Sequence, residues 1–316
     1  MKRIITGILA LLLVLTLCAC KTKTKQTAAP VEERTAAEIV RTAMNMTTAA
    51  NSLHMSGELQ VGVTLMDGPG TERQADADSG EKAASPEKIA ATVTFDADCK
   101  YAPMIMKGSF TLKLVESYSK TDTYEQTVQF CLWEQDGKTM MAYAVEPDDS
   151  WIALNVPMAK EEPSFTKWID LFRSGIFNFA RTGEDTIDGV PVTLYTGSLD
   201  GEGCRKIFDT MKNDVDGIPP ITFSEELAAK LSPIGITYAI DSDDRPVRVR
   251  VDATAFADTL LENVINPLIG ANDQSIAIDV FTIDLYYSDF NAVESVEPPE
   301  DYIDYSRNGL SYDFYG

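Results

Sequence analysis

Cys18 and Cys20 are the first residues of this chain whose types and spacing could do chemistry. They form a C-x-C pair in the stretch LTLCACKTKTK. Such a pair can bind a metal ion or form a redox couple, because thiolates are good ligands and good nucleophiles. Both uses need further groups nearby, and the residues that follow are only Lys and Thr. The pair therefore favours neither chemistry, and its role depends on the segment that carries it.

The single histidine, His54, is the second candidate. It shares the polar face of a predicted strand with Ser56 and Glu58, so it is either a general base or, more commonly, an ordinary exposed histidine. One histidine excludes a multi-histidine zinc site, and the sequence contains neither H-E-x-x-H nor G-x-S-x-G. Nothing in the spacing joins His54 to a cysteine as a catalytic dyad. We therefore predict no catalytic residue and no enzyme activity.

Two acidic stretches, 213–217 and 241–244, could offer oxygen ligands to calcium. Neither has the full D-x-[DN]-x-[DN]-G-x5-E pattern, and hairpin tips are commonly acidic. Gly201-Glu-Gly203 lacks the third glycine of a dinucleotide-binding loop. The sequence thus predicts no metal site and no cofactor.

The start of the chain is a targeting segment. Met1-Lys2-Arg3 is basic, and residues 4–17 are almost wholly apolar. Fourteen residues of helix are roughly 21 Å long, which is short of a ~30 Å hydrocarbon core. A basic start, a short apolar run and small residues at its end are typical of a secretory signal peptide.

The end of the apolar run, Leu17-Cys18-Ala19-Cys20, resembles the bacterial lipobox. That resemblance implies cleavage after Ala19 and a diacylglyceryl thioether on Cys20, while Cys18 leaves with the signal. We therefore expect a signal peptide at 1–19, and a lipidated Cys20 with a polar, flexible tether at 20–34. Two or more lipid chains anchor a protein stably. The predicted location is extracytoplasmic, with the membrane as a partner held through Cys20.

Charge and cysteine content narrow the class of protein. The chain has 49 acidic and 27 basic side chains, a formal net charge of -22. Such acidity argues against nucleic-acid binding, where a basic patch is expected. Apart from Cys20, the mature chain would keep Cys99, Cys131 and Cys204, so one disulfide at most is possible. Cys99 and Cys131 lie on neighbouring predicted strands and are the pair to expect; three free, buried thiols are the alternative.

Hydrophobic periodicity predicts the elements that position these residues. The clearest strand begins at Leu53, with apolar and polar side chains alternating over thirteen residues. Capping boxes at Thr35 and Thr222 predict helix starts, and a one-residue phase shift after Val280 predicts a bulge. Residues 66–88 read as a flexible acidic loop and 301–316 as an acidic, Tyr-rich tail. Strands are expected at 53–65, 89–97, 104–115, 124–133, 139–145, 150–155, 176–182, 190–198, 234–241, 247–252 and 275–288, and helices at 35–50, 165–172, 204–211, 223–231 and 254–268.

These elements predict an α+β fold. The helices are too few and too scattered to cover both faces of a parallel sheet. A strongly curved antiparallel sheet of about ten strands, a half-barrel wrapped over a few helices, fits better. We expect it as one domain over residues 35–300.

Several segments resemble bacterial lipoproteins of the LolA/LolB/LppX-like superfamily, in a Gram-positive branch of it. The resemblance covers most of residues 35–303 and concerns architecture and strand style. It implies a half-barrel with helices on its concave side, where better-known members hold acyl chains. The segments that carry it are LHMSGELQV, FARTGEDTIDGVPVTLYTG, ITYAIDSDDRPVRVRVD and FTIDLYYSDFNAVESVEPPEDY.

Two functions stay open at this point. In the first, apolar side chains line a cavity for a lipid or another apolar ligand. In the second, the helices fill the same concavity, and the acidic loop and tail bind proteins of the cell envelope as an interaction or sensing module. The candidate lining residues are Val61, Val63, Phe95, Phe110, Leu112, Phe130, Leu132 and Trp151.

Overall fold

The computed structural model describes residues 34–67, 87–116, 123–135, 138–148, 150–156, 178–212, 224–265 and 274–304. The predicted signal peptide, Cys20 and the tether up to residue 33 lie outside these ranges. So do residues 68–86 of the predicted acidic loop and the helix expected at 165–172.

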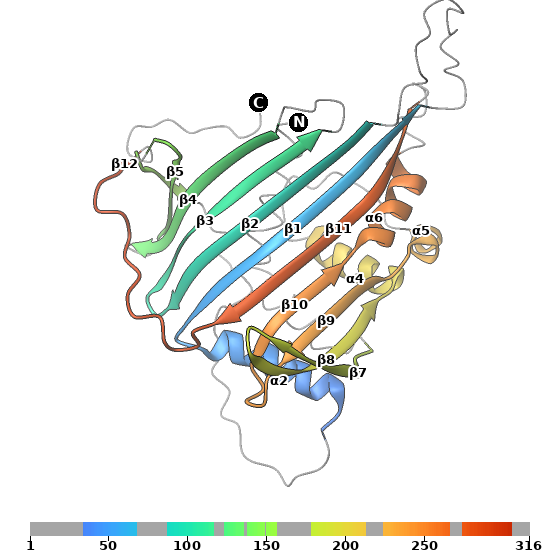
Figure 1. The fold of residues 1–316 in the computed structure, drawn as a ribbon, viewed down its shortest axis with the longest axis horizontal. Helices are drawn as coiled ribbons and strands as arrows, with labels where there is room; N and C mark the ends of the chain where they lie inside the picture. The colour runs from blue at the N-terminus through green and yellow to red at the C-terminus, as the bar shows by residue number, and fades with distance from the viewer. Residues whose placement is uncertain are drawn as a thin grey trace, which may run out of the picture.

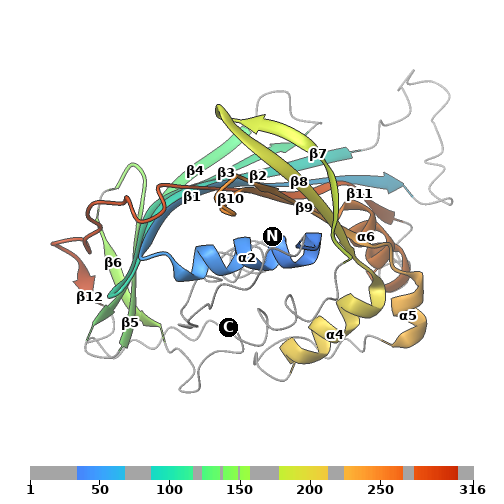
Figure 2. The ribbon, with the colours of Figure 1, turned by 90° about the horizontal axis from the view of Figure 1, so that it is seen from below.

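The described strands form one strongly curved sheet with helices on its concave side (Figures 1 and 2). Its twelve strands follow the order β12-β6-β5-β4-β3-β2-β1-β11-β10-β9-β8-β7. All neighbours are antiparallel except β12 and β6, which are parallel. The predicted α+β half-barrel is therefore confirmed. The strands are β1 (Ser52–Asp67), β2 (Glu87–Tyr101), β3 (Met104–Glu116), β4 (Thr123–Gln135), β5 (Lys138–Val145), β6 (Ile152–Val156), β7 (Ala180–Ile187), β8 (Val190–Leu199), β9 (Ile234–Ile240), β10 (Pro246–Asp252), β11 (Gln274–Ser288) and β12 (Ile303–Asp304).

β1 lies in the middle of the sheet and shows why the chain folds this way. Leu53, Met55 and Leu59 point to the concave side and are buried, whereas His54 between them points to the convex side. Successive side chains of a strand alternate between faces. Which set of alternating positions in a strand is apolar therefore decides which face of the strand turns toward the helices.

A bulge bends the sheet between β1 and β11. Gly62 pairs with Val280, but Val63 pairs with Ile278, so one residue of β11 is unmatched. The backbone N–H of Ile278 donates instead to Asp258 Oδ1 at 3.0 Å, from the helix beneath. This confirms the predicted bulge and shows that a side chain satisfies the backbone group it frees.

Four described helices and one short π-helical turn lie on the concave side (Figure 2). α2 (Ala36–Ala49) begins with the predicted capping box: the Thr35 side chain accepts from the Glu38 N–H, and Glu38 accepts from the Thr35 N–H. The others are α4 (Gly201–Lys212), α5 (Glu225–Lys230), α6 (Thr254–Leu260) and η1 (Leu261–Ile265). They pack chiefly against β7 to β11 and against each other.

Several predicted boundaries were wrong, among them both ends of the predicted acidic loop, since residues 66–67 belong to β1 and residues 87–88 to β2. Ser224, not Thr222, caps α5, because its hydroxyl accepts from the Leu227 N–H at 3.1 Å. The strand expected at 176–182 is β7, which begins at 180 and continues to the turn at Asp188-Gly189. Both turn residues have positive φ, which suits a two-residue hairpin turn.

Residues 289–304 form a strap that crosses the end of the sheet and reaches its outer edge (Figure 1). Lys100 Nζ donates to the Glu294 carbonyl at 2.6 Å, and Lys107 Nζ donates to the Glu297 carbonyl at 3.3 Å. The strap ends in β12, which pairs with β6. Residues 301–304 of the predicted acidic, Tyr-rich tail therefore belong to this strap.

The strap helps to cover a second apolar cluster, on the convex side of β3 to β6. Its buried members are Ile105, Cys131, Trp133, Met140, Ala142 and Ala153, with Trp151, Val296 and Tyr302 packed against them. The Trp133 and Tyr302 rings meet edge to face with centroids 5.7 Å apart.

The disulfide expected between Cys99 and Cys131 was wrong. Cys99 lies in the concave core, Cys131 lies in the convex cluster, and β3 separates their strands. Cys99, Cys131 and Cys204 are all buried, and none of the three forms a disulfide. The alternative of buried thiols is the one the structure shows.

Candidate functional site

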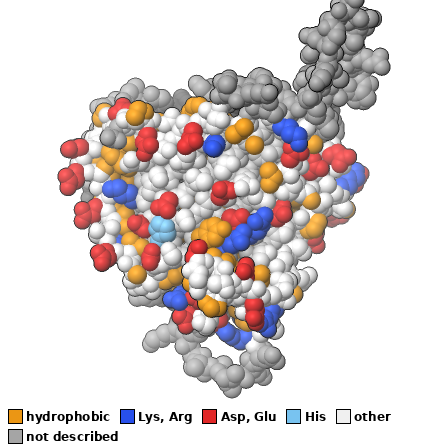
Figure 3. Space-filling model, viewed as in Figure 1, with side chains coloured by type: hydrophobic (Ala, Val, Ile, Leu, Met, Phe, Trp, Pro, Cys, Tyr) orange, Lys and Arg blue, Asp and Glu red, His pale blue; other side chains and the backbone are white. Residues whose placement is uncertain are grey.

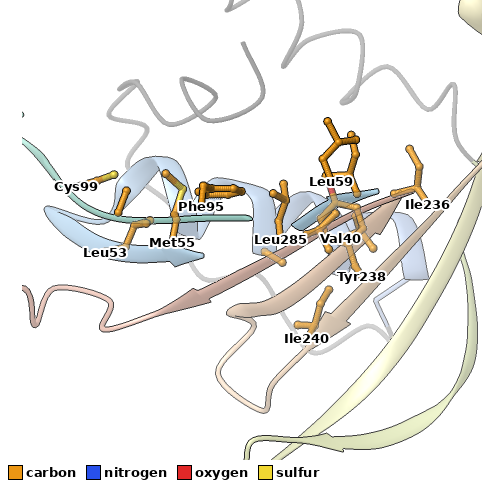
Figure 4. Packing of buried hydrophobic residues seen from close by; sticks show 14 of the residues in the cluster. Val40, Leu53, Met55, Leu59, Phe95, Cys99, Ile236, Tyr238, Ile240 and Leu285 are labelled. Atoms are coloured by element: carbon orange, nitrogen blue, oxygen red, sulfur yellow. The ribbon is translucent and has the colours of Figure 1, made fainter. Parts of the chain in front are cut away.

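The helices divide the concave side of the sheet into two halves. On one half, α2 inserts Val40 and Ala43, which are 1% and 0% exposed, into the core with Leu59 of β1 and Tyr238 of β9 (Figure 4). This half is an ordinary packed core. It matches the expectation that helices fill part of the concavity.

The other half, formed by β3, β4 and β5, is apolar but less buried. The described helices pack chiefly on the far side, against β7 to β11. We call its partly or fully exposed concave side chains the concave strip. Its members are Phe110, Leu112, Leu114, Tyr124, Val128, Phe130, Tyr143 and Val145.

Strand register arranges the strip in cross-strand rows. Phe110 pairs with Phe95 on one side and with Val128 on the other, and Phe130 pairs with Gly108. The Phe110 and Phe130 rings are 6.3 Å apart and tilted by 36°. Gly108 matters here because a Cβ at this position would lie 2.0 Å from the Asp96 carbonyl oxygen. The rows thus make one continuous aromatic and aliphatic surface.

Gln126 adds one polar group to this surface. It pairs with Leu112, so it faces the concave side, and its Nε2 donates to the Glu146 carbonyl at 2.7 Å. A second, longer bond of 3.2 Å joins it to the Thr127 carbonyl. The amide lies toward the Tyr124 end of the strip.

The structure separates the eight residues predicted to line a cavity. Phe110, Leu112 and Phe130 belong to the concave strip and are half-buried. Phe95 and Leu132 are 8% and 4% exposed and belong to the core beside it.

The three remaining candidates lie elsewhere. Val61 and Val63 are half-buried on β1, and Val61 packs against the core. The prediction for Trp151 was wrong, because this side chain packs on the convex cluster and not on the concave side with the other seven predicted lining residues. The prediction missed Leu114, Tyr124, Val128, Tyr143 and Val145. Period-two spacing from Phe110 and Phe130 would have found those on β3 and β4.

The convex side is polar and charged where it faces the viewer in Figure 3. His54 lies there, with Nδ1 2.9 Å from Asp98 Oδ1 and Nε2 3.4 Å from Asp96 Oδ2. Cys99 follows Asp98 in β2 but points to the opposite face, into the core. The structure therefore does not bring His54 and Cys99 together as a dyad.

An ion-pair network lies on the same face over β10 and β11. Asp284 accepts from Arg248 Nε at 2.7 Å and from Arg250 Nη1 at 3.2 Å. Arg248 also lies over the Tyr286 ring, 5.6 Å from its centroid. These contacts join neighbouring strands across the convex surface, so they are structural in this geometry.

Among the described residues, no group of three or more His, Cys, Asp or Glu side chains is arranged to hold a metal ion. In the same ranges, no helix is both long enough and apolar enough to cross a membrane.

Comparisons with known proteins give structural likenesses only. No family model matches the chain, and no curated protein matches it in sequence. The lipoprotein LppX of Mycobacterium tuberculosis is 17% identical, with a TM-score of 0.40 over 83% of this chain and 98% of LppX. LprF of Mycobacterium bovis is 14% identical, with a TM-score of 0.40 over 84% and 96%. A DUF1329 family protein of Desulfovibrio piger is 7% identical, with a TM-score of 0.17 over 82% and 93%.

Proposed function

We propose that this chain is a membrane-anchored, extracytoplasmic lipoprotein that binds a lipid or another apolar ligand on its concave side, without catalysing a reaction. One observation carries the proposal: the concave strip is a continuous apolar surface that the core buries only in part. Exposed patches of this kind mark binding sites in soluble domains. Transfer of a ligand's apolar surface onto the strip is favourable at about 25 cal/mol per Å².

The dimensions of the strip suit an acyl chain. From Tyr124 to Phe130, β4 advances six residues, or about 20 Å at 3.3 Å per residue. One leaflet of a ~30 Å hydrocarbon core is about 15 Å thick, so the strip is longer than a membrane lipid chain. β3 and β4 are paired along the whole strip, and β4 and β5 are paired at Val128 and Phe130, so most of the strip rests on hydrogen-bonded backbone.

Anchoring is supported by the lipobox-like residues before Cys20. Arg34 donates to both carboxylate oxygens of Asp244, at 2.5 and 3.0 Å, at the tip of the β9–β10 hairpin. The tether would therefore meet the domain at this hairpin. Fourteen extended residues span at most roughly 45 Å, which sets the reach from the membrane.

Binding of lysophosphatidylcholine to the full chain, held in amphipol and measured by calorimetry below the micelle concentration, tests the proposal. Phe110→Ala and Phe130→Ala should each weaken binding about tenfold, since truncating one ring removes on the order of 1.5 kcal/mol of apolar contact. Thr111→Ala changes a convex neighbour on the same strand and should bind like the wild type. Equal affinities in all four proteins would contradict the proposal. A wild type that binds nothing would favour the interaction module with a filled core.

A further inference from the structure

Exposure increases along the concave face of β3 and β4, from the buried core residues next to the concave strip to the far end of the strip. Met106 on β3 and Leu132 on β4 are each 4% exposed. Further along the same strands, Phe110 and Phe130 are half-buried. At the far end, Tyr124 is 53% exposed. The surface therefore has a closed end and an open end.

The closed end is apolar. Cys99 is 1% exposed and Ala97 is 2% exposed, beside Met106 and Leu132, and all four belong to the main core cluster. Among the described residues, the buried polar side chains are those of Ser52, Thr64 and Thr282, and none of them is charged. A polar head group placed here would lose its hydration without compensation, whereas a terminal methyl group would not.

The open end supplies polar groups and solvent. Tyr124 carries a hydroxyl, and Gln126 and the Glu146 carbonyl form a hydrogen-bonded pair nearby. Val145, beside them on β5, is 39% exposed. Neither Tyr124 nor Val145 belongs to the two core clusters. A head group at this end keeps its contact with water.

The charge at the open end is negative. Glu146 directly follows Val145, Asp148 comes two residues later, and both are exposed. The chain as a whole carries a formal charge of -22. Like charges repel, so this end favours a head group without net negative charge.

We infer that the strip takes an alkyl chain tail first through the Tyr124–Val145 end, and that it prefers zwitterionic lipids to anionic ones. The methyl end lies toward Met106 and Leu132, and the head group stays beside Gln126. This inference rests on the proposed function and adds the direction of the ligand and the class of its head group.

Tryptophan fluorescence with brominated lipids tests the direction. Tyr124→Trp and Phe110→Trp place a reporter at the open end and midway along the strip, and the wild type supplies the background from the native tryptophans. The probes are lysophosphatidylcholines brominated either near the head group or near the methyl end of the chain. Tyr124→Trp should be quenched more by the bromine near the head group, and Phe110→Trp more by the distal bromine.

Calorimetry on the same samples distinguishes a failure of the proposed function from a failure of the inferred direction. If neither probe binds, the proposed function fails, and the inference fails with it. If the probes bind but the quenching order is reversed, the function stands and the direction is wrong. If the probes bind and neither reporter responds, the ligand lies outside the strip, and both the proposed function and the inference fail.

Replacing lysophosphatidylcholine by lysophosphatidylglycerol tests the head group. Affinity should fall about threefold or more at low salt, and the difference should shrink at high salt, where exposed charges are screened. Equal or tighter binding of the anionic lipid would overturn the preference for zwitterionic lipids.

Discussion

At the residue scale, the chain shows how one strand carries two kinds of surface. His54 and Leu53 are neighbours, yet the first meets carboxylates on the convex side and the second is fully buried in the core. The same alternation places Asp98 and Cys99 on opposite faces. Residues that look like a candidate site in sequence are therefore held apart by the pleat of the strand.

The buried thiols give a prediction at this scale. Burial raises the pKa of Cys131 to about 11 and that of Cys204 to about 12. At pH 8 both thiols are neutral in the folded protein, and a neutral thiol is a poor nucleophile. Iodoacetamide should therefore leave Cys131 and Cys204 unmodified in the native chain and modify both in guanidinium chloride.

Site-resolved mass spectrometry after digestion reads out this alkylation. The same digest without reductant should contain no peptide pair that joins Cys99 to Cys131. Rapid native alkylation of Cys131 would contradict the burial that the convex cluster gives it.

At the element scale, the strap is the part of the fold that closes the sheet edge. Ile303 N–H donates to the Trp151 carbonyl at 2.9 Å, and Tyr302 packs on Trp133. β12 is only two residues long, so side-chain contacts must supply much of its stability. The strap therefore depends on the convex cluster more than on strand pairing.

Tyr302→Ala should lower the free energy of unfolding by about 1 kcal/mol, through loss of the edge-to-face ring contact. Hydrogen exchange should become faster in β6, the strand that pairs with Ile303, and stay unchanged in β1. Tyr302→Phe retains the ring and serves as the control. Urea unfolding and exchange mass spectrometry measure the two effects. An unchanged β6 in Tyr302→Ala would show that the strap does not depend on this contact.

The sequence predicted an element well where contacts between neighbouring residues determine it. The capping box of α2, the alternation of β1 and the bulge in β11 were each readable from neighbouring residues. The strap was not, because its contacts join residues far apart in the chain: Tyr302 packs on Trp133, and Lys100 binds the Glu294 carbonyl. The prediction of the disulfide was wrong for a related reason. If the alternation of a strand is assigned with an error of one residue, its cysteine is placed on the opposite face of the sheet.

At the scale of the whole molecule, the half-barrel combines a packed half and a partly open half. α2 fills the concavity beneath β9 and β10, whereas the strip on β3 to β5 stays partly exposed. The sequence placed Phe110, Leu112 and Phe130 on the concave face but could not tell filled from open. That difference depends on where the helices pack, which strand periodicity does not encode.

The proposed anchor also belongs to this scale. Cys20→Ala should abolish lipidation and leave the predicted signal uncleaved, whereas Cys18→Ala should retain both lipidation and cleavage. Metabolic labelling with a fatty acid and mass spectrometry of the N-terminal peptide distinguish the two variants. Equal loss of label in both would contradict the assignment of Cys20.

Native mass spectrometry of the full chain, purified from the membranes of its own host and released from a mild detergent, tests the central claim most directly. The account predicts a population heavier than the lipidated chain by the mass of a lipid, which organic extraction removes and which Phe110→Ala and Phe130→Ala reduce. A wild-type spectrum that shows only the covalently lipidated chain, without a bound lipid, would contradict the account if the same conditions preserve other lipid complexes.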